Sequence, residues 1–173
     1  MQEALKFWEY LVCNIFFVML SAIMIYYFLK FNFKLEKRKN SLLFLVLSFG
    51  LVNGIVASLW TNLFEISTVL LPVKQVLLLV ISVIIIRISL RVNCLKAALG
   101  FVVFLLSTGV GSALVSPILN ITEEEALSNL STYIIANIII YVVAIVLMVI
   151  LQLVIKLVQK IIGKTNDKQA SVH

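Results

Sequence analysis

Three polar side chains at one end of an apolar stretch are the residues best suited to bind a ligand: Glu65, Lys74 and Gln75. Together they offer a carboxylate, an ammonium group and an amide, so both signs of charge and several hydrogen-bond donors and acceptors are present. A charge at the centre of a bilayer costs about 2.5–3.5 kcal/mol, but a shallow lysine lowers that cost by extending toward water. Two interpretations stay open: Lys74 extends to the membrane surface or pairs with Glu65, or it faces a ligand.

Residues for catalysis or metal binding are lacking in the sequence. The single histidine is the last residue, His173, and the single aspartate, Asp167, lies close to it in a polar segment. Cys13 and Cys94 fall near opposite membrane surfaces in the topology given below, whereas a disulfide needs Cα atoms within about 7 Å. Neither a phosphate-binding loop nor a dinucleotide motif is present. We therefore expect a protein that is not an enzyme and that uses no metal and no cofactor.

The composition is that of a membrane protein. Of the 173 residues, 62% are hydrophobic and 13% are charged, whereas soluble domains have about 45–50% apolar and about 25% charged residues. The net charge of +6 could suggest a nucleic-acid ligand. However, the basic residues form short clusters beside apolar runs, which is the arrangement that orients a chain in a membrane. We therefore expect the lipid bilayer, and no nucleic acid, as a partner.

Five apolar runs are long enough to cross a bilayer, for which a helix needs about 20 residues. They cover residues 8–29, 41–63, 68–90, 95–119 and 133–157. The sequence therefore predicts an all-α, polytopic helix bundle over residues 1–163. Gly163 is predicted to end the last helix, and residues 164–173 are expected to form a disordered polar tail in the cytoplasm.

The connectors between these runs alternate in charge. Every lysine and arginine except Lys6 and Lys74 lies in the first connector, in the third connector, or at the end of the last run and beyond. The third connector contains Arg87, Arg91 and Lys96. Because basic clusters stay in the cytoplasm, we expect the N-terminus outside and the C-terminus inside. The expected location is the cell membrane, specifically the inner membrane of a bacterium.

The second run contains small residues four positions apart: Gly50, Gly54 and Ser58, with Asn53 beside them. Small residues at this spacing form a groove that admits the backbone of another helix, and an asparagine can add a hydrogen bond across it. The partner helix can belong to the same chain or to a second copy. The sequence therefore predicts close packing here, with a homodimer seam as the alternative.

The fourth run is also rich in small residues, and Gly109 and Ala113 share one face of it. Helices of this composition pack closely on their neighbours. We therefore expect the fourth helix to lie centrally in the bundle, with Gly109 and Ala113 at the contact. The alternative is a flexible segment that lines a cavity.

A family resemblance rests on two stretches of the sequence. The first is residues 86–99, in the third connector and the helix that follows it. The second is residues 120–129 before the last helix, which begin Asn120-Ile-Thr-Glu-Glu-Glu. They resemble the membrane sensor region of Agr-type peptide-pheromone receptor histidine kinases. The resemblance implies a polytopic domain, often dimeric, that senses an extracellular peptide and passes a signal along its last helix. The sequence ends at His173 and contains neither the dimerisation helix with a phosphorylated histidine nor the ATP-binding domain of such kinases.

Three functions are compatible with this sequence. The first is sensing, with an extracellular peptide as the ligand and a homodimer or a partner membrane protein as the assembly. The second is a small transporter or a substrate-binding membrane subunit that works with a partner. The third is a structural or assembly role without a ligand. A neighbouring gene for a response regulator or a peptide precursor would favour sensing, and transporter genes would favour uptake.

Overall fold

A computed structural model describes residues 2–33, 35, 40–63, 71–119 and 129–170. These residues form five helices: α1 (Gln2–Asn32), α2 (Ser41–Leu63), α3 (Leu71–Leu90), α4 (Cys94–Leu119) and α6 (Leu130–Ala170). Each helix contains a stretch that is long and apolar enough to cross a membrane. The prediction of an all-α protein with five membrane-spanning helices is confirmed for the described part of the chain.

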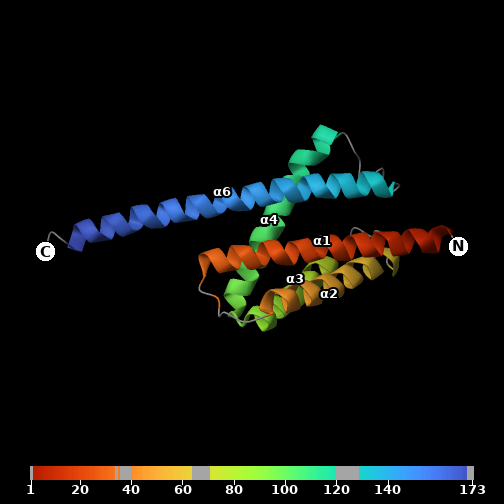
Figure 1. The fold of residues 1–173 in the computed structure, drawn as a ribbon, viewed down its shortest axis with the longest axis horizontal. Coiled ribbons are helices and arrows are strands. Elements are labelled where there is room, and N and C mark those ends of the chain that lie inside the picture. Colours follow the sequence, from red (N-terminus) through yellow and green to blue (C-terminus); the bar gives the residue numbers. More distant parts are fainter. Residues whose placement is uncertain (1, 34, 36–39, 64–70, 120–128, 171–173) are drawn as a thin grey trace.

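The helices are arranged around α1, which contacts α2, α4 and α6. Figure 1 shows α1 and α6 side by side and running in the same direction, with α2 and α3 on the opposite side of α1. Helix α4 crosses this group obliquely and contacts α3 at its beginning and α6 farther along. The beginning of α1 and the end of α6 lie at opposite ends of the molecule (Figure 1).

Asparagine side chains define the boundaries of several helices. Helix α3 ends where Arg91 adopts a positive φ of 51°, a conformation that interrupts helical hydrogen bonding. Asn93 then caps α4, because its Oδ1 accepts a hydrogen bond of 2.9 Å from the backbone N–H of Lys96. Asn129 caps α6 in the same manner, with its Oδ1 3.0 Å from the backbone nitrogen of Ser131. These caps set where the third, fourth and last membrane helices begin and end.

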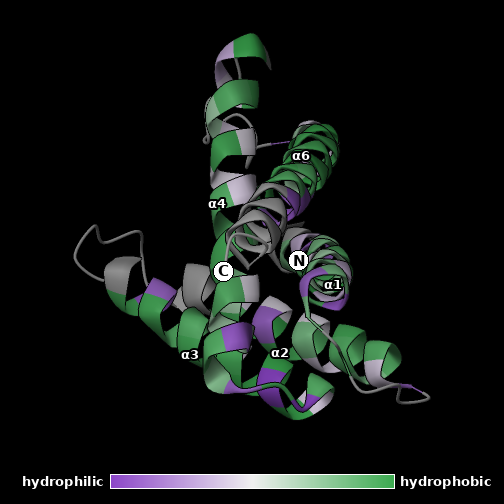
Figure 2. Ribbon diagram, turned by 90° about the vertical axis from the view of Figure 1, so that its left-hand side faces the viewer, coloured by the Kyte–Doolittle hydropathy of each residue, from purple (hydrophilic) through white to green (hydrophobic). Residues whose placement is uncertain are grey.

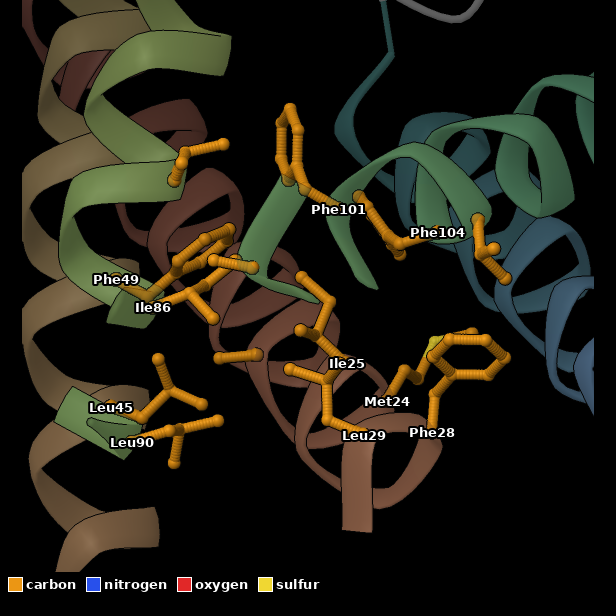
Figure 3. Packing of buried hydrophobic residues seen from close by; sticks show 14 of the residues in the cluster. Met24, Ile25, Phe28, Leu29, Leu45, Phe49, Ile86, Leu90, Phe101 and Phe104 are labelled. Carbon is orange, nitrogen blue, oxygen red and sulfur yellow. The ribbon is translucent and has the colours of Figure 1, made fainter. Parts of the chain in front are cut away.

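Aliphatic and aromatic side chains from all five described helices form the core, to which α6 contributes Ala144 and Met148. Figure 3 shows the side chains that converge between α1, α2 and α3: Ile25, Leu29, Leu45, Phe49, Ile86 and Leu90. From α4, Phe101 meets Phe49 edge-on, with 6.2 Å between the ring centroids. Figure 2 shows that hydrophobic residues make up most of each helix, and many large ones are exposed on the outside of the bundle. Because lipid is as apolar as this core, close van der Waals packing, rather than exclusion of water, holds the helices together.

The last helix is longer than expected. The prediction that Gly163 ends it is wrong, because α6 continues to Ala170. No described glycine has the positive φ that ends a helix, and one glycine inside a helix costs only about 1 kcal/mol. The 41 residues of α6 extend over about 60 Å, twice the thickness of a bilayer core of about 30 Å. Residues 164–170 therefore belong to a helix that reaches well beyond the membrane.

Candidate functional site

A polar cluster inside the bundle joins three helices through one asparagine. The Nδ2 of Asn14 in α1 donates a hydrogen bond of 3.0 Å to the Oγ of Ser58 in α2. The Oδ1 of the same amide accepts a hydrogen bond from the hydroxyl group of Tyr133 in α6. Ring contacts support the tyrosine, since Tyr10 meets it edge-on at 5.2 Å between centroids. One side chain of α1 therefore bonds to two helices that lie on different sides of it.

A second pair lies deeper between α1 and α6. The hydroxyl groups of Ser21 and Tyr141 are 2.7 Å apart, and the ring of Tyr141 stacks on Phe17 at 5.5 Å. Ser21 also donates to the backbone carbonyl of Phe17, at 3.0 Å. We call the side chains joined by these hydrogen bonds the polar network: Asn14, Ser21, Ser58, Tyr133 and Tyr141. All its members are neutral side chains with hydrogen-bonding groups, so the network can hold the positions of the helices or exchange between them.

The sequence contained a signal for this network that hydropathy conceals. Tyr133, Asn137 and Tyr141 are four residues apart, so they share one face of α6. Asn14 and Ser21 are seven apart and likewise share a face of α1. Polar residues within a membrane helix usually face its partners, and these stripes could have been found by that criterion. The predictions from sequence depended on charged and small residues and did not include these stripes.

The predicted ligand residues lie on the first turns of α3, apart from the polar network. Lys74 is half-buried and Gln75 is exposed. Glu65, the third predicted residue, lies outside the described residues. In the described part of the chain, the backbone of α3 closely approaches α2 and α4 but not α1 or α6. The structure therefore places Lys74 and Gln75 at the same end of the bundle as the start of α6 (Figure 1) without joining them to the polar network.

The groove of small residues on α2 is occupied by α1 of the same chain. A Cβ atom on Gly54 would lie 2.8 Å from Cγ1 and 2.9 Å from the Cα of Ile15, and one on Gly50 would meet Met19. Ser58 continues the contact through its bond with Asn14. The two helices therefore touch where the small residues are, and the groove is not free to receive a second copy.

Asn53 does not make the hydrogen bond expected of it. Its side chain is 5% exposed, and neither its Nδ2 nor its Oδ1 has a hydrogen-bond partner among the described residues. The interhelical bond at this groove is instead made by Asn14, from the opposite helix. An unpaired buried amide is unfavourable, so Asn53 does not stabilise the α1–α2 contact through its polar atoms.

The contact face of α4 differs from the predicted one. Gly109 and Ala113 are exposed, and a Cβ atom on Gly109 would meet nothing within 4 Å. The prediction that they pack against a neighbour is wrong. Gly111 makes the contact, because a Cβ atom there would lie 3.1 Å from the backbone oxygen of Ile140 in α6. Gly109 and Gly111 are two residues apart and so point to different sides of the helix.

The basic connector lies where α3 turns into α4. Arg87 and Arg91 are exposed, and Lys96 is half-buried with its Nζ 5.2 Å from the centroid of Phe33, just past the end of α1. Lys30, in the last turn of α1, lies at the same end of the molecule as this connector. The basic residues thus gather at one end of the bundle, as an orientation set by positive charge requires.

Cysteine labelling tests the predicted orientation. Cys94 is exposed at the start of α4, on the side assigned to the cytoplasm. In a Cys13→Ser background, a membrane-impermeant maleimide should label Cys94 in inside-out vesicles and leave it unlabelled in intact cells. Labelling of Cys94 from outside the cell would overturn the assigned orientation.

The chain matches no protein-family model, no curated protein and no solved structure. The fold and the polar network define the class, a multi-pass α-helical membrane protein. Within the part that the structure describes, no three histidine, cysteine, aspartate or glutamate residues come together to hold a metal ion.

Proposed function

We propose that this chain is a non-catalytic membrane protein that senses an extracellular peptide. The observation that supports the proposal most is the construction of α6. Its first turns bond to α1 through Tyr133 and Tyr141, and its last turns extend beyond the other helices (Figure 1). A single rigid helix therefore connects a polar network at one end of the bundle with the space beyond the other end.

Helix α6 is also held loosely enough to move. Only 11% of its apolar stretch is buried, so few packed side chains oppose a shift. Hydrogen bonds between membrane helices contribute about 0.6 kcal/mol each on average, and shifts of about 1–2 Å between helices are common in signalling proteins. A peptide that prefers one position of α6 by a few kcal/mol would change the populated state. The signal would then travel along α6 to its projecting end.

Lys74 and Gln75 are the proposed ligand residues, together with Glu65. Lys74 and Gln75 lie in the first turns of α3, which starts at the end of the bundle where α6 begins, and Glu65 lies outside the described residues. This end is outside the cell in the predicted orientation. Because α2 separates α3 from the polar network, a peptide bound here would act on α6 through the α2–α1 contact at Ser58 and Asn14.

Peptide binding is the direct test. We expect the protein in lipid nanodiscs to bind a secreted peptide encoded beside its gene, and Lys74→Gln to weaken that binding about tenfold, equivalent to about 1.4 kcal/mol. A charge-assisted hydrogen bond contributes about this much. The measurement is fluorescence anisotropy of labelled peptide, with Lys160→Gln at the opposite end as the control. Absence of binding by every candidate peptide would contradict the proposal.

The transport alternative has less support from the geometry. It rested on small residues of α4 lining a cavity, and Gly109 and Ala113 lie on the exterior instead. Proteoliposome uptake, or copurification with an ATPase, would favour that alternative over sensing.

A further inference from the structure

An apolar groove lies between α1 and α6, on the side of the polar network toward the basic end of the bundle. Its volume is about 250 Å³, and it is open along the surface. Residues of both helices line it: Ile23, Met24, Phe28, Ile145, Met148 and Val149, with Tyr27, Phe31 and Gln152. Drug-sized ligands occupy about 300–1,000 Å³, so this groove is too small for a folded peptide and suits a single hydrocarbon chain.

Two lysines lie at the groove, one from each helix. The Nζ of Lys30 in α1 is 5.9 Å from the ring centroid of Tyr27, and the Nζ of Lys156 in α6 is 5.0 Å from that of Phe31. Tyr27 and Phe31 both line the groove, so the two ammonium groups are held beside it. The amide of Gln152 lies one helical turn before Lys156 and adds a neutral donor. Both acidic residues of α1, Glu3 and Glu9, are in the first third of the helix, toward the opposite end from Lys30.

We infer that this groove binds an anionic phospholipid, with one acyl chain between α1 and α6 and the phosphate beside Lys30 and Lys156. The apolar lining matches an acyl chain, and paired ammonium groups at the membrane surface match a phosphate. The inference goes beyond the sensing proposal and does not depend on it. The inference holds whichever leaflet of the membrane contains the basic end of the bundle.

A second copy of the chain fits the same surface less well. Copies related by a twofold axis along the membrane normal lie at equal depth, so an interface at this groove would bring residues of similar depth together, and those near the axis would meet their own equivalents. Lys156 of one copy would then approach Lys156 of the other, and like charges repel. An anionic lipid neutralises the same charges.

Native mass spectrometry of the delipidated protein in a neutral detergent tests the inference. Dioleoyl phosphatidylglycerol and dioleoyl phosphatidylcholine have identical acyl chains and differ in headgroup charge. We expect tighter binding of phosphatidylglycerol, weakened about fivefold by Lys30→Gln and about fivefold by Lys156→Gln, because each lysine near a membrane surface contributes about 1 kcal/mol. Lys96→Gln, which removes a lysine that contacts Phe33 instead, should leave the affinity unchanged.

A second pair of variants tests the acyl-chain position. Val149 lines the groove and is 49% exposed, whereas Val146 is 52% exposed and does not line it. Val149→Trp should fill the groove and reduce phosphatidylglycerol binding at least fivefold, and Val146→Trp should not. Equal binding of the two lipids, unchanged binding in both lysine variants, or a lipid-independent dimer that Val149→Trp disrupts would each overturn the inference.

Discussion

Replacing Gly54 by alanine should lower the free energy of unfolding by about 1–3 kcal/mol, the usual cost of overpacking a close contact. The added Cβ atom would lie 2.8 Å from Cγ1 of Ile15 and 2.9 Å from its Cα. A side-chain atom can rotate away, but a Cα atom moves only with its helix. The whole of α1 would therefore have to shift away from α2. Unfolding in mixed micelles with increasing SDS measures the change.

Gly109→Ala is the matched control. It makes the same chemical change in another membrane helix, where a Cβ atom would meet nothing within 4 Å. Alanine favours a helix over glycine by about 0.8–1 kcal/mol in water, so this variant should be neutral or slightly more stable. If both variants lost equal stability, the close approach of α1 to Gly54 would not be the cause, and the packing described for these helices would be wrong.

The contrast between these glycines shows what could be predicted from the sequence. The number of helices and most of their limits follow from the length of apolar runs; the second predicted run, 41–63, has the limits of α2. The rotation of each helix about its own axis, which decides the residues that face a neighbouring helix, does not follow from the length of the apolar runs. A membrane helix is apolar on its lipid side and on its protein side, so hydropathy does not identify the face that packs. Gly109 was therefore assigned to a contact that Gly111 makes.

The candidate site was harder to predict for a related reason. The predicted site depended on charge, because charged residues such as Lys74 are rare in membrane helices, and Gln75 is the polar residue next to it. The residues that the structure brings together are neutral and come from helices distant in sequence, with Asn14 and Tyr133 separated by 119 positions. The spacing of polar residues gives the face of each helix, but only the packing of the helices shows which faces meet.

The polar network also relates the sensing proposal to the lipid inference. Both concern the boundary between α1 and α6, which is bonded through Tyr133 and Tyr141 and has an apolar groove toward the basic end. A lipid in the groove would support α6 where few residues of the chain contact it. The hydrogen bonds would then fix one part of α6, and the lipid would steady the next part. The strength of the network therefore sets how firmly α6 is held to α1, in addition to the contact of α6 with α4.

Removing the amide of Asn14 measures that strength. Asn14→Ala eliminates the bonds to Ser58 and Tyr133 together. Interhelical hydrogen bonds in membranes contribute about 0.6 kcal/mol on average and about 1.7 kcal/mol at most, so the two bonds together predict a loss of about 1–3 kcal/mol. Tyr133→Phe keeps the ring beside Tyr10 and removes only the hydroxyl group. We expect a loss of about 0.6–1.7 kcal/mol from it in the same SDS unfolding measurement.

A double-mutant cycle distinguishes loss of the Asn14–Tyr133 hydrogen bond from a general loss of stability. If Asn14 and Tyr133 interact directly, then Tyr133→Phe should cost little once Asn14 is alanine, which gives a coupling energy of about 0.6–1.7 kcal/mol. Asn32→Ala is the control, because it makes the same chemical change in α1 and Asn32 donates only to the backbone carbonyl of Phe28 within its own helix. It should show no coupling to Tyr133. Additive losses for Asn14 and Tyr133 would mean that the two side chains act independently, and α6 would then not be fixed to α1 by this bond.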